Sequence, residues 1–196
     1  MNRPHDHLVM LGAALLLAVS CASDPADRQE VARQEAARMA PPSEPLSGFQ
    51  HFELWELALA EEVQSDEKKV RQADALQQKL SARVQPLLNS WEASDSAEAR
   101  TLLIQPRVQQ LRVVSGGARF WVGAMAGESI VDLDLRLVEK ASGKEIGRTR
   151  IMRGSGAMAG GWSVGATDRN LLDYIVDITH EYLSQSYSGQ SSSTKR

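Results

Sequence analysis

The sequence predicts one α+β domain, in which a small, mainly antiparallel sheet carries two long helices on one face. The composition is that of a globular chain, with 42% hydrophobic and 24% charged residues. Apolar residues recur at intervals of three and four over residues 66–91 and 168–183, as in helices that lie on a core. Residues 129–140 alternate apolar and charged side chains, as a half-buried strand does. The elements follow one another in the order β-α-β-β-β-α.

The first twenty residues are expected to be a signal peptide and not part of this domain. Residues 8–20 carry no charge, but thirteen residues are too few to cross a bilayer, which takes about twenty. Their length and position match the apolar region of a signal peptide. The predicted organisation is a signal peptide at 1–20, a lipidated cysteine and tether at 21–48, the folded domain at 49–187 and a flexible tail at 188–196.

A short stretch, "LAVSC", places Ala18, Val19 and Ser20 before Cys21, the only cysteine in the chain. It resembles the lipobox of bacterial lipoprotein precursors. The resemblance implies that Cys21 receives a diacylglyceryl group, that the peptide is cut before it, and that the new amine is acylated, for example with palmitate. An ordinary signal peptide with Cys21 near the cut is the alternative, although a lone cysteine cannot form an internal disulfide.

The residues after Cys21 bear on location. Ala22 and Ser23 follow it without an aspartate, which by resemblance to lipoprotein sorting in Gram-negative bacteria implies the outer membrane, with the domain facing the periplasm. Each buried methylene contributes about 0.8 kcal/mol, so the acyl chains would hold the protein at the membrane. The net charge of −3 argues against nucleic acid as a partner.

Residues 22–48 are predicted to contain one short, alanine-rich helix. Asp24 can cap it and Pro25 suits its first position, but its apolar residues are nearly all alanine and offer little to bury. Residues 49–63 alternate like a strand and have the composition of a helix, and we predict a strand. A long helix follows from Asp66.

Two further elements complete the predicted domain. Residues 101–115 end in alternating, β-branched positions and form a second strand, in which Pro106 indicates a sheet edge or a bulge. The last helix, at 168–183, can be capped by Thr167 or Asp168. Its apolar stripe consists of Leu171, Ile175, Ile178 and Tyr182.

A hairpin is predicted to join the third and fourth strands through the loop at 141–143, whose glycine suits a left-handed conformation. Pairing across this loop puts Asp134 beside Arg150 and leaves Arg136 opposite Arg148. One face of the hairpin is then apolar and the other charged, and the like-charge pair is the one feature that does not fit.

Two Gly/Ala-rich runs, at 115–127 and 154–166, flank this hairpin and should be neighbours in space, because the hairpin returns the chain to the same side. Neither is predicted to bind a nucleotide, because the second run has no Lys-Ser/Thr after it, as a phosphate loop requires, and the first does not open a helix. One interpretation is that they are wide, bulged strand connections. The other is an exposed lobe that docks a partner or a lipid surface, because Met, Trp and Arg are favoured at contact sites. The residues of this lobe are Arg119, Phe120, Trp121, Met125, Met158 and Trp162.

The strings "SGGARFWVGAMAG", "ASGKEIG" and "GAMAGGWSVGATD", followed by an amphipathic helix, resemble a family of bacterial outer-membrane lipoproteins of unknown function. The resemblance covers roughly residues 49–185. The broader architecture is similar to the anticodon-binding-like α/β domains of periplasmic lipoproteins. These resemblances imply a lipoprotein of the cell envelope and assign no chemistry to any residue.

Catalysis has little support in the sequence. His51 and His180 are far apart in the chain, and no His or Cys pair has the spacing of metal ligands. Asp132 and Asp134 share one strand face, where arginines across the hairpin explain them without a catalytic role. We therefore predict no enzymatic activity, no cofactor and no metal.

Two hypotheses of function follow. In the first, a lipid-anchored accessory or adaptor protein binds a partner, or another copy of itself, through the Gly/Ala-rich lobe. In the alternative, the domain binds a small ligand in the periplasm, in a pocket between the lobe and the helices.

Overall fold

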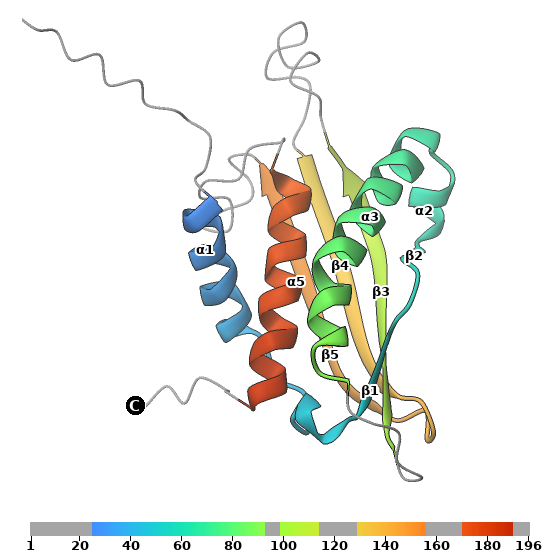
Figure 1. Cartoon of the computed structure of the whole chain (residues 1–196). Helices are drawn as coiled ribbons and strands as arrows, with labels where there is room; N and C mark the ends of the chain where they lie inside the picture. The colour runs from blue at the N-terminus through green and yellow to red at the C-terminus, as the bar shows by residue number, and fades with distance from the viewer. Residues whose placement is uncertain (1–24, 93–98, 114–128, 156–169, 190–196) are drawn as a thin grey trace, which may run out of the picture.

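In the part of the chain that the structure describes, five strands form one open sheet, and the long helices lie side by side over one of its faces (Figure 1). The computed structural model describes residues 25–92, 99–113, 129–155 and 170–189. The predicted α+β class and mainly antiparallel sheet are confirmed. The helices are α1 Pro25–Arg38, the 3₁₀ helix η1 Leu46–Gly48, α2 Glu61–Gln64, α3 Glu67–Asn89 and α5 Leu171–Ser188. The strands are β1 His51–Leu54, β2 Ala58–Leu59, β3 Thr101–Arg112, β4 Ser129–Glu139 and β5 Glu145–Ser155.

Strand β3 lies inside the sheet, which has the order β1-β3-β4-β5, with β2 also paired to β3. β1 and β2 run parallel to β3, whereas β4 and β5 are antiparallel to their neighbours. The predicted edge position of Pro106 is therefore wrong, although a register shift of the bulge kind follows it at 108–110. The amides of Trp55 and Ala60 bond to β3 carbonyls two residues before and two residues after Pro106. The proline thus lies opposite the break between β1 and β2, where its missing N–H interrupts neither bond.

The predicted β4–β5 hairpin is confirmed. Gly143 in its loop has a φ of +68°, and the register pairs Asp134 with Arg150 and Arg136 with Arg148. Glu145 accounts for the like-charge pair, because its carboxylate accepts from Arg136 Nε at 2.8 Å and from Arg148 Nη2 at 3.2 Å. Both hydrogen bonds lower the pKa of Glu145, and the one from Arg136 has the larger effect.

Both predicted long helices are present. α3 begins after Asp66, whose carboxylate accepts from the amides of Lys68 and Lys69 at 2.8 and 3.3 Å and caps the helix. These backbone hydrogen bonds lower the pKa of Asp66. The caps predicted for α5, at 167 and 168, lie outside the described residues. The apolar stripe predicted for α5 is buried as expected, at Leu171, Ile175, Ile178 and Tyr182.

Helix α1 lies against α5 and is part of the domain, so most of the segment predicted as a tether is folded. Ala32 and Ala36 are buried in this contact, because their small side chains let the two helices approach closely. The guanidinium of Arg28 donates to Asp177 of α5 at 2.5 Å. Leu46 in η1 is also fully buried. The alanines of α1, which are expected from the sequence to offer little to bury, are thus the residues that pack against the domain.

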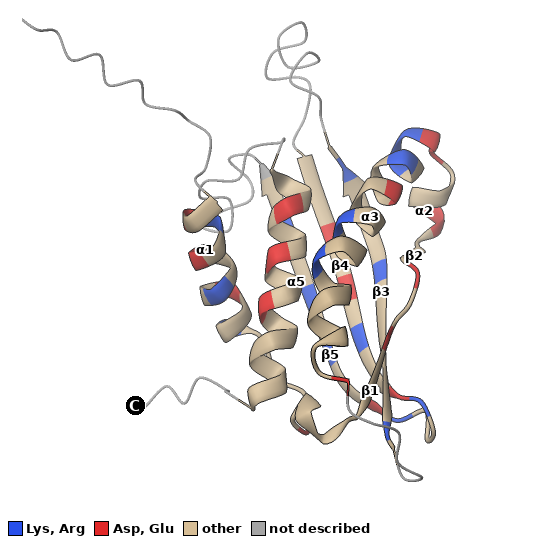
Figure 2. Cartoon of the chain, viewed as in Figure 1, with Lys and Arg blue, Asp and Glu red and all other residues tan. Residues whose placement is uncertain are grey.

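The core fills the space between the helices and one face of the sheet, and the opposite face is charged. Figure 2 shows basic and acidic residues interspersed along β3, β4 and β5. The alternation predicted for β4 is seen, with Val131, Leu133, Leu135 and Leu137 fully buried on the helix side. Thr149 and Ile151 of β5 join them, as predicted.

Candidate functional site

The residues that the sequence singled out lie outside the described residues. They are Cys21, the predicted lipidation site, and the predicted lobe of Arg119, Phe120, Trp121, Met125, Met158 and Trp162. The strand residues that flank the two Gly/Ala-rich runs are described. Arg112 pairs with Ile130 and Ser129 pairs with Ser155, so both runs leave the sheet at the same end, as the topology predicts.

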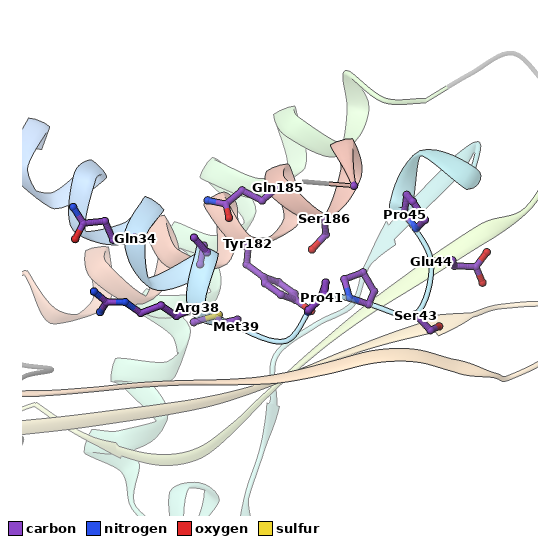
Figure 3. Close-up of a pocket in the computed structure, with 14 residues that line it drawn as sticks. Gln34, Arg38, Met39, Pro41, Ser43, Glu44, Pro45, Tyr182, Gln185 and Ser186 are labelled. Atoms are coloured by element: carbon purple, nitrogen blue, oxygen red, sulfur yellow. The ribbon is translucent and has the colours of Figure 1, made fainter. Parts of the chain in front are cut away.

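A cleft of about 790 Å³ lies where α1 ends, between the last turns of α5 and the extended chain at 39–45 (Figure 3). Ligand pockets typically have volumes of about 300–1,000 Å³. Gln34 and Arg38 line the cleft from α1, and Gln185 and Ser186 line it from α5. Its apolar lining comes from alanines of α1 and from a methionine and three prolines of the extended chain. The cleft therefore combines an apolar surface with a few amide, hydroxyl and charged groups.

Prolines after α1 build one wall of this cleft. Pro41 and Pro42 come shortly after the end of α1 at Arg38 and cannot continue the helix, so the chain becomes extended. The amide of Ser43 then donates to the carbonyl of Ile146, on the edge of β5, at 2.7 Å. Gly147 permits this approach, since a Cβ there would lie 3.0 Å from the Cβ of Pro42. The wall is thus fixed to the sheet edge.

Tyr182 supports the cleft from α5. Its side chain is buried, and its Oη donates to the carbonyl of Ala40 at 3.2 Å. Burial raises the pKa of Tyr182, and the hydrogen bond with Ser186 opposes this to a lesser extent. The phenol therefore keeps its proton and acts as a donor that ties α5 to the extended chain.

Glu44 is a fixed anion at the rim of the cleft. Arg100 Nη1 and Nη2 donate to its two carboxylate oxygens at 2.9 and 3.1 Å, and Arg100 Nε donates to Glu139 at 2.7 Å. The hydrogen bonds from Arg100 lower the pKa of Glu44, and those from Ser142 and then Arg100 lower the pKa of Glu139. The guanidinium also lies 4.2 Å from the centre of the Phe49 ring. The arginine thus ties the segment before β1 to the end of β4.

A buried charge pair joins α1 to the sheet. Arg153 of β5 is 2% exposed on the helix-covered face, and its Nη2 lies 3.4 Å from Oε1 of Glu35. The guanidinium carbon is 5.3 Å from the centre of the Tyr174 ring of α5. Burial lowers the pKa of Arg153, and the charge of Glu35 opposes this. This pair is not predicted from the sequence, because the predicted domain begins after α1.

The carboxylates of β4 have arginine partners, as the sequence analysis proposed. Asp132 accepts a hydrogen bond from Arg150 Nε at 2.8 Å and a second from Arg150 Nη2. Arg148 Nη1 lies 3.6 Å from Asp134. Both contacts are diagonal across the two strands, because the backbone register puts Arg150 opposite Asp134 and Arg148 opposite Arg136.

His180 lies on α5, where burial lowers its pKa. In the part of the chain that the structure describes, no three His, Cys, Asp or Glu side chains are grouped so as to hold a metal ion. Among the same residues, no helix combines the length and the apolarity needed to cross a membrane.

The cleft is not predicted from the sequence. Two signals were present, namely the run "PPSEP" shortly after a helix and Tyr182 on the buried stripe of α5. A tyrosine on a buried stripe needs a partner for its hydroxyl, and an extended, proline-rich segment has carbonyls that its own backbone does not use. The pairing could not be derived because it joins residues 142 positions apart.

A family model described as "Domain of unknown function (DUF4410)" matches residues 24–160 of the chain. The match begins just before α1, which agrees with the packing of that helix against the domain. No curated protein matches the chain.

Several solved structures resemble the chain distantly. The PelC dodecamer from Paraburkholderia phytofirmans is 13% identical, with a TM-score of 0.45 over 74% of this chain and 95% of that chain. A Xanthomonas campestris protein of family DUF330 is 10% identical, with a TM-score of 0.40 over 80% of this chain and 94% of that chain. A minor lipoprotein from Acinetobacter baumannii is 14% identical, with a TM-score of 0.31 over 72% of this chain and 93% of that chain.

Proposed function

Because the chain belongs to the DUF4410 family, a family defined without an activity, we propose a function from the chain's own residues: it is a lipid-anchored protein of the cell envelope. The anchor is Cys21, carrying acyl chains such as palmitate after removal of the signal peptide at 1–20. The stretch "LAVSC" and the absence of an aspartate after Cys21 support this anchor and an outer-membrane location facing the periplasm. The similarity to anticodon-binding-like domains stays a prediction.

The protein acts in this proposal as an accessory protein that binds a partner, and not as an enzyme. The observation that carries this is the cleft at the end of α1, which is open to solvent and has polar groups on two helices. Arg38 offers donors on one side. Gln34 and Gln185 already donate to Glu30 and to the carbonyl of Arg33, but each side-chain amide keeps a second N–H and a carbonyl oxygen for a partner. Such a surface can hold an extended polypeptide segment by side-chain hydrogen bonds over an apolar lining. Binding or self-association through the lobe stays a prediction beside it.

A small ligand is the second candidate, and the volume of the cleft favours it. At about 790 Å³ the cleft is large enough for a drug-sized molecule, and its lining is mixed in polarity. A ligand of this kind would have an apolar body and a polar edge facing the two glutamines. The two candidates differ in what should be found in the cleft, which is a protein in one case and a small molecule in the other.

The experiment that separates them places a photo-crosslinking amino acid at Gln34, in cells that express the full chain. Gln29 is the matched control, because it is an exposed glutamine on the same helix and does not line the cleft. A partner protein predicts a discrete protein adduct at Gln34 that is absent at Gln29. A small ligand predicts no such adduct and a bound mass in native mass spectrometry of the purified protein. Equal adducts at both positions, or neither an adduct nor a bound mass, would contradict the proposed role of the cleft.

A further inference from the structure

The chain between the proposed lipid anchor and the folded domain is very short. Cys21 is separated from Pro25, the first residue of α1, by four residue steps. A fully extended chain covers at most about 3.6 Å per residue, so the anchor lies within about 14 Å of the start of α1. A tether of 28 residues, as predicted for 21–48, would have left the domain free to turn.

Helix α1 cannot lengthen this connection without leaving the domain. Arg28 bonds to Asp177, and Glu35 is paired with the buried Arg153. Near the other end of the helix, Gln185 Nε2 donates to the carbonyl of Arg33 at 3.1 Å. Ion pairs and buried alanines thus hold α1 along most of its length, and detaching it would expose a buried arginine.

The start of α1 lies at one defined end of the domain. The contacts of α1 with Asp177 and Gln185 show that it runs parallel to α5, so both helices begin at the same end. α3 also begins there, because Gln72 in its second turn exchanges two hydrogen bonds with the backbone of Val113. Figure 1 shows the starts of α1, α3 and α5 at this end, together with the end of β3 and the start of β4. We call it the anchor end.

The hairpin loop at 141–143 lies at the opposite end (Figure 1). β4 has 11 residues, and a strand rises about 3.3 Å per residue, so the two ends are about 36 Å apart. The cleft is also remote from the anchor end, since it lies at the far end of the 14-residue helix α1, which is about 21 Å long.

From these lengths we infer that the anchor end of the domain faces the bilayer, and that the cleft and the hairpin loop face away from it. The inference rests on the proposed lipidation of Cys21. The contacting surface is the headgroup layer of the membrane that holds the acyl chains. Lys68 in the first turn of α3 and Arg112 at the end of β3 are exposed at this end. Figure 2 shows acidic as well as basic residues in α2 and at the start of α3, so the short connection, and not net charge, sets the orientation.

The orientation has a consequence for the two Gly/Ala-rich runs. Both runs leave the described domain at the anchor end, where Ser129 pairs with Ser155. The strand ends that carry the runs are therefore on the membrane side, whereas a partner in the cleft is approached from the periplasm.

Fluorescence quenching in vesicles tests the inference. The full chain is produced in Gram-negative cells, purified in its acylated form and inserted into vesicles of phosphatidylethanolamine and phosphatidylglycerol. Since acylated Cys21 has no free thiol, a thiol dye reacts only with an introduced cysteine, either Lys68→Cys at the anchor end or Ala141→Cys in the hairpin loop. With a nitroxide on the lipid headgroup, the dye at position 68 should lose most of its emission and the dye at position 141 very little. Equal quenching at the two positions, or stronger quenching at 141, would overturn the orientation.

A longer connection provides the control. About fifteen Gly/Ser residues inserted between Ser23 and Asp24 add an r.m.s. distance of about 21 Å, and should largely relieve the quenching at position 68. Unchanged quenching would show that the short connection is not what orients the domain. Intact mass separates the two proposals, because a mature chain without acyl groups would refute the anchor itself, whereas a failed quenching pattern in acylated protein would refute the orientation alone.

Discussion

Glu35 provides the strongest test of whether α1 belongs to the folded domain. Its carboxylate, 10% exposed, faces the buried guanidinium of Arg153 at 3.4 Å. Removing one partner of a buried ion pair costs about 3–5 kcal/mol. Two features reduce this cost. Glu35 keeps some exposure to solvent, and the Tyr174 ring still stabilises the Arg153 guanidinium by a cation–π contact of about 1 kcal/mol. We expect Glu35→Gln to lower the free energy of unfolding by about 2–4 kcal/mol.

Urea unfolding, followed by circular dichroism, measures this change on the chain from residue 21 with Cys21→Ser. Glu30→Gln is the matched control, since Glu30 pairs with Arg33 on the exposed side of the same helix and should cost less than about 1 kcal/mol. Arg153→Met combined with Glu35→Gln should recover most of the loss, because an apolar side chain leaves no buried charge. If Glu35→Gln costs no more than Glu30→Gln, α1 is not held in the way described.

Three further predictions concern stability. Burial holds the pKa of His180 in the folded protein below its ordinary value of 6.5, so on acidification the unfolded chain takes up this proton before the folded protein does. The free energy of unfolding should therefore be at its full value above pH 6.5 and fall as the pH drops toward the folded pKa. Urea midpoints measured across this pH range should show the fall, and His180→Gln should remove it. Gly147→Ala should cost about 1–3 kcal/mol because its Cβ would press on Pro42, whereas Gly143→Ala should cost about 1 kcal/mol from its left-handed backbone alone. If either variant unfolds at the same temperature as the unchanged protein, this prediction is wrong. Tyr182→Phe should cost about 1 kcal/mol through the lost hydrogen bond to the cleft wall, and an unchanged urea midpoint would show that this bond does not hold the wall.

Local patterns were enough to predict most of the fold. The alternation in β4, the left-handed glycine at 143 and the charge pairing across the hairpin all depend on residues close in sequence, so the register followed from them. The apolar stripes of α3 and α5 were recognised for the same reason. Pro106 was misjudged because its tolerance depends on a break in the neighbouring parallel strands, which the local sequence does not show.

Long-range contacts explain what the sequence did not predict. α1 was assigned to a tether because its alanines bury little area each, yet their small size is what permits close contact with α5. The pair of Glu35 and Arg153 and the cleft beside Tyr182 join segments more than a hundred residues apart. Such pairs have no signature within a short window, and they decide both where the cleft forms and how the anchor is connected.

Intact mass spectrometry of the mature protein tests the central claim most directly. The protein is extracted with detergent from the membranes of a Gram-negative host that expresses the full chain. We predict a mature chain that begins at Cys21 and carries the added mass of a diacylglyceryl group and an amide-linked acyl chain. A chain that begins elsewhere, or an unmodified Cys21 thiol, would contradict the lipid anchor and the orientation inferred from it.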